Sequence, residues 1–265
     1  EQARTLGSWG PRRRCPCLLA LIRNTWRTLT SMGTALVLLF LLALGAALAA
    51  LYGGWRPHAS ALMRLLAVPL ASVVALAVAS GLRPADLGLD RARWRRGLAW
   101  AGICAGVIAA VLTIVMLMPG GLELFRDARF PSLPPALFAA LVTIPLVTVL
   151  PEELLFRGVL DGALARRFGP RLAPVVGALA FGGWHALTSL SLASGNSTVR
   201  RLVGDGAFAQ VLCTAGVVAV TSVAGFGLSW LRRRTGSLLA PIGLHWALNA
   251  GGALAAGIAG SAATW

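Results

Sequence analysis

The sequence contains few charged residues and no lysine. Of its 265 residues only 12% are charged and 57% are hydrophobic, and all 24 basic residues are arginine. About a quarter of the residues in an ordinary soluble domain are charged. This scarcity of charge, together with a mean hydropathy of +0.76, excludes a soluble enzyme, a disordered chain and a fibrous repeat. The composition therefore predicts a polytopic membrane protein.

Cysteine and histidine are also scarce, with four and three residues respectively. Cys15 and Cys17 lie beside a run of arginines, whereas Cys104 and Cys213 lie inside apolar segments. A cysteine buried in an apolar helix usually behaves as a small hydrophobic residue. The cysteines therefore predict neither a disulfide framework nor a metal cluster.

The charges that are present are mostly positive. Twenty-four basic and nine acidic residues give a net charge of +15. Such an excess can indicate binding to nucleic acid, but these arginines lie between apolar blocks, where the positive-inside rule places them. We therefore expect no nucleic-acid partner. Abundant Ala, Gly, Leu and Arg without Lys is typical of GC-rich bacterial coding.

Seven apolar blocks have lengths suited to crossing a bilayer, which takes roughly 20 residues of helix. We expect an all-α, polytopic transmembrane helical bundle of about seven spans, within a range of six to eight. The third block contains Gly102-x-x-x-Gly106, which predicts either a helix-packing face or lipid-facing glycines. The expected spans are residues 34–51, 59–80, 98–118, 135 to beyond 160, 172–192, 208–231 and 237–258.

Arginine-rich loops predict the orientation of the chain. The N-terminal segment and the loops around 83–96, 166–171 and 232–234 are basic, and the alternate loops are much less so. Short basic loops remain in the cytoplasm, so we expect a multi-pass protein of the cell membrane with a cytoplasmic N-terminus. The expected parts are a basic cytoplasmic segment, a first set of transmembrane helices and a second set that carries the polar motifs, at residues 1–33, 34–134 and 135–260.

Three of the late spans carry ionisable or amide side chains, which are costly inside a bilayer and indicate function by default. The motifs are Glu152-Glu153-x-x-x-Arg157, Phe181-x-x-x-His185 and His245-x-x-x-Asn249. Residues four apart share one face of a helix. We therefore expect Glu153 to pair with Arg157, and Glu152, about 100° further round the helix, to point elsewhere.

The helical rise places the three motifs at similar depths. Counted from the basic loops, His245 lies about 13 Å into its span, and His185 and Glu152 lie roughly 20 Å into theirs. We therefore expect a carboxylate, two imidazoles and an amide to converge in the middle to cytoplasmic part of the bilayer.

Taken together and in this order, the motifs resemble those of the CPBP (Abi) family of intramembrane proteases, which includes the type II CAAX prenyl proteases. The resemblance covers roughly residues 136–255, and no motif position departs from it. It implies a peptidase that cleaves a peptide bond near the membrane surface, and it identifies residues 135–260 as the catalytic helices.

The resemblance also implies roles for individual residues. Glu152 would activate water with the help of His185, while His245 and Asn249 would stabilise the oxyanion. This division agrees with the chemistry, because a poorly solvated carboxylate is a good proton acceptor and fixed N–H donors suit a developing oxyanion. The residues expected to orient this set or the substrate are Glu153, Arg157 and Phe181. For Arg157 the alternative is direct contact with a substrate carboxylate.

We expect no cofactor, with zinc as the alternative. Zinc ligands would be Glu152, His185 and His245. The H-E-x-x-H helix of zinc peptidases, which supplies a pair of histidines, is absent. The resemblance favours a glutamate-based mechanism without a metal.

The predicted function is that of an intramembrane endopeptidase, whose partners are the lipid bilayer and a membrane-embedded or membrane-associated peptide or protein substrate. The alternative is a non-proteolytic membrane protein, namely a transporter, an immunity factor or a scaffold, because intramembrane Glu and His also suit proton relays. Transporters often consist of related halves. The first half of this chain has no counterpart to the three motifs, which argues against a transporter.

Overall fold

The computed structural model describes residues 77, 81–189, 204 and 206–262 of the chain. The described residues form helices and no strand, which confirms the all-α class. Four of these helices are long and apolar enough to cross a membrane: Arg91–Leu117, Leu133–Phe168, Ala207–Thr235 and Leu239–Ala262. The expected spans 34–51 and 59–80 lie outside the described residues, except for Ala77. The total of seven spans therefore stays a prediction.

The fifth expected span corresponds to a short helix. Helix α8 runs over Ala173–Thr188 and has 16 residues, or about 24 Å at the helical rise. The hydrocarbon core of a bilayer is about 30 Å thick, so α8 as described is shorter than a full crossing. The other late spans extend a few residues beyond their predicted ends.

The fourth expected span is one long helix in which α-helical and π-helical turns alternate. Its parts are α5 (Leu133–Phe138), η2 (Ala139–Val149), α6 (Leu150–Glu153), η3 (Leu154–Leu160) and α7 (Asp161–Phe168). Segments η2 and η3 are π-helical, a rare form that is common at functional sites. Pro145 lies inside η2, where its missing N–H disfavours a regular α-helix.

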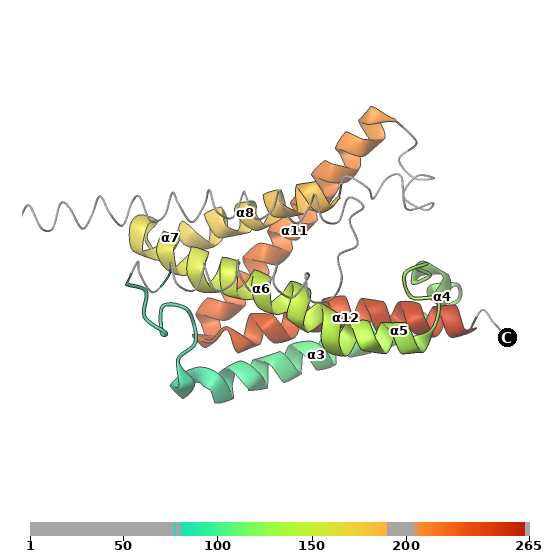
Figure 1. Ribbon diagram of the computed structural model, residues 1–265, viewed down its shortest axis with the longest axis horizontal. Helices are drawn as coiled ribbons and strands as arrows, with labels where there is room; N and C mark the ends of the chain where they lie inside the picture. The colour runs from blue at the N-terminus through green and yellow to red at the C-terminus, as the bar shows by residue number, and fades with distance from the viewer. Residues whose placement is uncertain (1–76, 78–80, 190–203, 205, 263–265) are drawn as a thin grey trace, which may run out of the picture.

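Helix α12 (Leu239–Ala262) is the central helix of the described bundle. It packs between α3 (Trp94–Leu117) on one side and α5 with η2 on the other, while α8 packs along α11 (Ala207–Thr235) (Figure 1). A side chain at Gly243 would overlap Ala101 of α3, and one at Gly182 would overlap Ser222 of α11. Small residues that let backbones approach closely are typical of helix packing in membranes.

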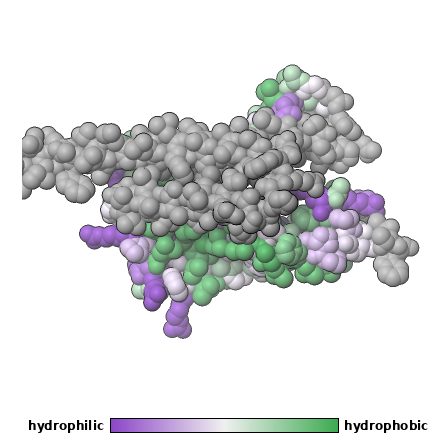
Figure 2. All heavy atoms as spheres, in the orientation of Figure 1, coloured by the Kyte–Doolittle hydropathy of each residue, from purple (hydrophilic) through white to green (hydrophobic). Residues whose placement is uncertain are grey.

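The outer face of the bundle is apolar. In α3 the side chains of Ile103, Val107 and Ile114 are all more than half exposed. Figure 2 shows a band of hydrophobic residues on this face with hydrophilic residues beyond both of its ends. No described atom lies within 4 Å of a Cβ built on Gly102 or Gly106. Their exposure favours lipid-facing glycines over a packing face.

A loop over residues 81–90 packs at the end of the bundle where the arginines 232–234 lie in the last turn of α11. Its Leu82 and Leu87 are buried in the same apolar cluster as Phe156 and Leu160 of the long helix. The N–H of Leu238 also donates to the Gly88 carbonyl at 2.8 Å. The loop is thereby fastened to the helix that carries the first polar motif.

Candidate active site

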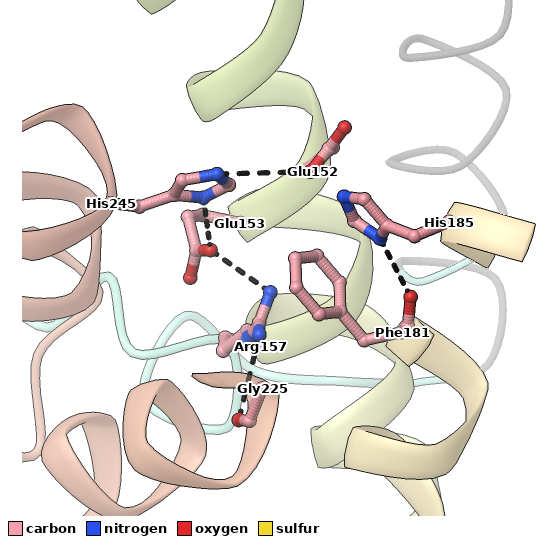
Figure 3. A network of polar contacts seen from close by, with 7 residues as sticks. All are labelled: Glu152, Glu153, Arg157, Phe181, His185, Gly225 and His245. Carbon is pink, nitrogen blue, oxygen red and sulfur yellow. Dashed lines mark hydrogen bonds and ion pairs between the residues drawn. The ribbon is translucent and has the colours of Figure 1, made fainter. Parts of the chain in front are cut away.

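Three helices bring the titratable residues of the motifs together (Figure 3). Glu152 lies on α6, His185 on α8 and His245 on α12. Nε2 of His245 is 3.9 Å from Oε2 of Glu152, whose side chain is 14% exposed. Figure 3 shows Glu152 between the two imidazoles, with His245 on one side and His185 on the other.

Glu153 links the first and third motifs. Its Oε1 atom lies 2.9 Å from Nη1 of Arg157 and 2.8 Å from Nδ1 of His245. The predicted pairing of Glu153 with Arg157 is confirmed, whereas the contact with His245 was not predicted. The Glu153 side chain is fully buried, and a buried carboxylate requires such partners because it has lost its hydration.

Arg157 is enclosed by protein on several sides. Its Nη2 lies 3.5 Å from the Gly225 carbonyl of α11, and its guanidinium carbon lies 3.9 Å from the centre of the Phe181 ring. A cation over an aromatic face gains electrostatic energy that increases with desolvation. These contacts hold the guanidinium group against Glu153.

The second motif orients His185. Nδ1 of His185 lies 2.8 Å from the carbonyl oxygen of Phe181, as expected for residues four apart on one helix. A carbonyl only accepts hydrogen bonds, so Nδ1 carries the proton in this contact and Nε2 is the acceptor of the neutral ring. Figure 3 shows this second nitrogen on the side that faces Glu152.

The two residues of the third motif differ in their exposure. His245 is 7% exposed, whereas Asn249, one helical turn further along α12, is exposed. Between them, the indole of Trp246 donates to the Ala140 carbonyl of η2 at 2.8 Å. This bond fastens α12 to the π-helical segment η2.

The expectation of no cofactor and the zinc alternative both stay predictions. Within the described part of the chain, no three His, Cys, Asp or Glu side chains are grouped so that they would hold a metal ion. Nδ1 of His245 lies against Glu153 and Nδ1 of His185 lies against a backbone carbonyl. Histidines that bind a metal through Nε2 commonly make such contacts through Nδ1, so these contacts do not argue against zinc.

Comparison with known proteins gives one family match. Residues 134–251 match a family model described as type II CAAX prenyl endopeptidase, Rce1-like. Over that segment the chain is similar to this family. The matched segment runs from the start of the long helix into α12 and includes every residue of the three motifs. No curated protein and no solved structure matches the chain.

Asp161 is a buried carboxylate that the sequence motifs did not include. It begins α7 and is only 1% exposed. Its position four residues after Arg157 is the signal that would have pointed to it, because Arg157 itself lies four residues after Glu153. The long helix therefore carries carboxylate, guanidinium and carboxylate groups at successive turns.

Proposed function

We propose that this protein is an intramembrane endopeptidase that hydrolyses a peptide bond of a membrane-associated protein or peptide. Similarity of residues 134–251 to the type II CAAX prenyl endopeptidase family supports this reaction class. The observation that carries the proposal is the position of Glu152 between His185 and His245 (Figure 3), next to the buried Glu153. A weakly solvated carboxylate beside an imidazole acceptor suits the activation of water.

In the proposed reaction, Glu152 takes a proton from a water molecule while the water oxygen attacks the scissile carbonyl carbon. Nε2 of His185 accepts the second water proton as a hydrogen bond and so directs the oxygen lone pair at the substrate. The tetrahedral intermediate collapses with cleavage of the carbon–nitrogen bond. The proton held by Glu152 passes to the leaving amine, which regenerates the carboxylate.

The contact between Glu153 and His245 determines how His245 supports this reaction. A carboxylate only accepts hydrogen bonds, so the 2.8 Å contact with Glu153 requires a proton on Nδ1. To stabilise the oxyanion, Nε2 must also carry a proton, and His245 then acts in its doubly protonated form. The amide of Asn249, one turn further along α12, supplies the second N–H donor from its exposed position.

The proposal can be tested by comparing membrane peptides, by mass spectrometry, between cells that produce the wild-type protein and cells that produce Glu152→Gln. We expect cleavage products that depend on Glu152, and loss of at least 1,000-fold in the rate of cleavage of the peptide so identified. Glu123→Gln, in an exposed ion pair with Arg126, is the matched control. Cleavage by Glu152→Gln at the wild-type rate would refute the assignment. Retention of activity after chelation, with metal content measured, tests the metal-free mechanism.

A further inference from the structure

Pro145 removes one backbone donor from the π-helical segment η2. In a π-helix each carbonyl accepts a hydrogen bond from the N–H five residues later, and the N–H of Leu150 donates to the Pro145 carbonyl in this way. Proline itself has no N–H, so the carbonyl of Ala140 loses the donor that residue 145 would supply. In an α-helix, where the donor is four residues later, the carbonyl affected would be that of Leu141.

The indole of Trp246 replaces this donor. Its Nε1 donates to the Ala140 carbonyl at 2.8 Å, which is the carbonyl that the π-helical pattern identifies. Ala140 is 0% exposed, so water cannot reach its oxygen. A buried acceptor without a partner destabilises the folded state. In membrane proteins, neighbouring helices commonly supply partners for the backbone groups that a proline frees, and here the neighbour is α12.

Trp246 directly follows His245, so the two side chains attach α12 to the long helix at two places. Nδ1 of His245 lies 2.8 Å from Oε1 of Glu153 in α6, and Trp246 donates to Ala140 in η2. Consecutive side chains point about 100° apart around a helix. A helix held by one polar contact can still rotate or slide. Two contacts in different directions and at separate places fix both its rotation and its register.

Elsewhere along this interface the two helices meet through small residues. A Cβ built on Gly257 of α12 would lie 2.5 Å from the Cβ of Ala136 in α5. Small residues let helix backbones approach closely, but such short side chains oppose sliding only weakly. The hydrogen bond of Trp246 is directional, and it therefore supplies a constraint that this packing lacks.

We propose that Trp246 is a positioning residue, whose indole replaces the N–H that Pro145 lacks and thereby fixes α12 in the register that presents His245 to the site. This inference rests on the proposed function, in which His245 stabilises the oxyanion. The indole has a single N–H donor, and Ala140 accepts it, so that donor is not available to a substrate. Loss of the bond should therefore lower kcat and leave KM nearly constant.

The test compares the effect of Trp246→Phe in two backgrounds. Phenylalanine keeps an aromatic ring but has no donor, so in the wild-type background we expect kcat to fall about tenfold and the melting temperature in detergent to fall by about 4 °C. In Pro145→Ala the new N–H donates to the Ala140 carbonyl in place of the indole, so Trp246→Phe should lower the melting temperature by less than half as much. It should still lower kcat about tenfold, because a donor within η2 does not hold α12.

Trp230→Phe is the matched control. Trp230 lies on α11 and is 51% exposed, so the same substitution there should change neither kcat nor the melting temperature. If Trp246→Phe does not fold in the wild-type background, Pro145→Ala/Trp246→Phe, in which the Ala140 carbonyl has a donor, is compared with Pro145→Ala. The expected difference in kcat between these two variants is again about tenfold.

A second readout does not depend on proteolysis. The chain has only three histidines, so ¹⁵N-labelled histidine gives three sets of ring signals, which His58→Gln and His185→Gln assign by elimination. We expect the His245 signals to shift in Trp246→Phe, because the ring is no longer held against Glu153, and to stay shifted when Pro145→Ala is added. Trp230→Phe should leave the His245 signals in place.

The positioning role of Trp246 is wrong if kcat and the His245 signals are unchanged in the folded Trp246→Phe variant. It is equally wrong if Pro145→Ala restores kcat together with the melting temperature, since the bond would then only stabilise the fold. Equal losses of melting temperature in the two backgrounds would overturn the replacement of the missing N–H. If the wild-type protein cleaves no peptide but the melting temperatures and the His245 signals respond as expected, the proposed function fails while the positioning of α12 stands.

Discussion

Helix α3 and the segment from Glu152 to Asp161 both belong to apolar spans, yet they meet opposite surroundings. Gly97 is the only buried residue of α3, and a large side chain such as Ile114 is 61% exposed. By contrast, every residue from Leu155 to Asp161 is buried. Lipid can solvate an apolar side chain but not a charge, so charged residues persist in a span only where protein encloses them. Burial, and not hydropathy, therefore distinguishes the segment that carries the candidate catalytic residues from α3.

The largest effect should come from the most enclosed charge. Glu153→Gln removes the anion that faces both Arg157 and His245, and we expect kcat to fall at least 100-fold and the free energy of unfolding to fall by about 3 kcal/mol. Cleavage of the identified peptide and thermal unfolding in detergent measure the two losses. Glu123→Gln, in an exposed ion pair, should change neither. Equal effects of Glu153→Gln and Glu123→Gln would show that burial does not determine how much a carboxylate contributes.

Asn249 is an exposed residue of the candidate site, whereas Glu153 is buried. Asn249→Ala should lower kcat about 100-fold, because the oxyanion loses one of its two donors. Since Asn249 is exposed, we expect the melting temperature to change by less than about 2 °C. A large loss of stability with full activity would show that Asn249 packs rather than reacts.

Paired glycine substitutions sharpen the contrast between the two faces of α3 and α12. A side chain at Gly243 would overlap the α3 backbone at Ala101, whereas Gly102 faces no described atom within 4 Å. We therefore expect Gly243→Leu to destabilise the protein by about 2 kcal/mol, and Gly102→Leu to leave its thermal unfolding nearly unchanged. Similar melting temperatures for the two variants would contradict the packing of α12 against α3.

The smallest effect should come from the loop at the basic end. Partial burial acts to raise the pKa of the Asp86 carboxyl, but the Arg83 N–H and the Arg166 guanidinium lower it by more, so the pKa lies below its ordinary value. A lowered pKa in the folded state stabilises the protein above the unfolded value of about 3.9, and this contribution is lost as the pH falls through the folded value.

Asp86→Asn should accordingly lower the melting temperature by only about 1 to 2 °C at neutral pH, because the Asp86–Arg166 pair is solvent-exposed. The difference between the variant and wild type should begin to shrink near pH 4 and disappear once the pH is below the lowered folded-state pKa of Asp86. Thermal unfolding of Asp86→Asn and of the wild-type protein as a function of pH measures this difference in melting temperature. A difference that grows towards acid pH would contradict the lowered pKa.

Much of the site follows from local rules that act within one helix. Glu153 with Arg157 and Phe181 with His185 are four residues apart, and both contacts are found. Spacing within one helix contains no information about the contact of Glu153 with His245, since these residues are 92 positions apart. Nor does it show that Asn249 is exposed while His245, on the same helix face, is buried. Both depend on where neighbouring helices end and cross.

The sequence by itself determined the class of the protein, the positions of its late spans and the order of its polar motifs, because hydropathy and helical period act along one segment at a time. The tertiary structure alone decided that Glu153 also meets His245, and that His245 is buried while Asn249 is exposed. Glu153 and Arg157 lie on one helix, but Arg157 also contacts the Gly225 carbonyl of α11, and Glu153 contacts His245 of α12. In a buried cluster each charge is stabilised by its nearest opposite charge, and that distance exists only once the helices have packed.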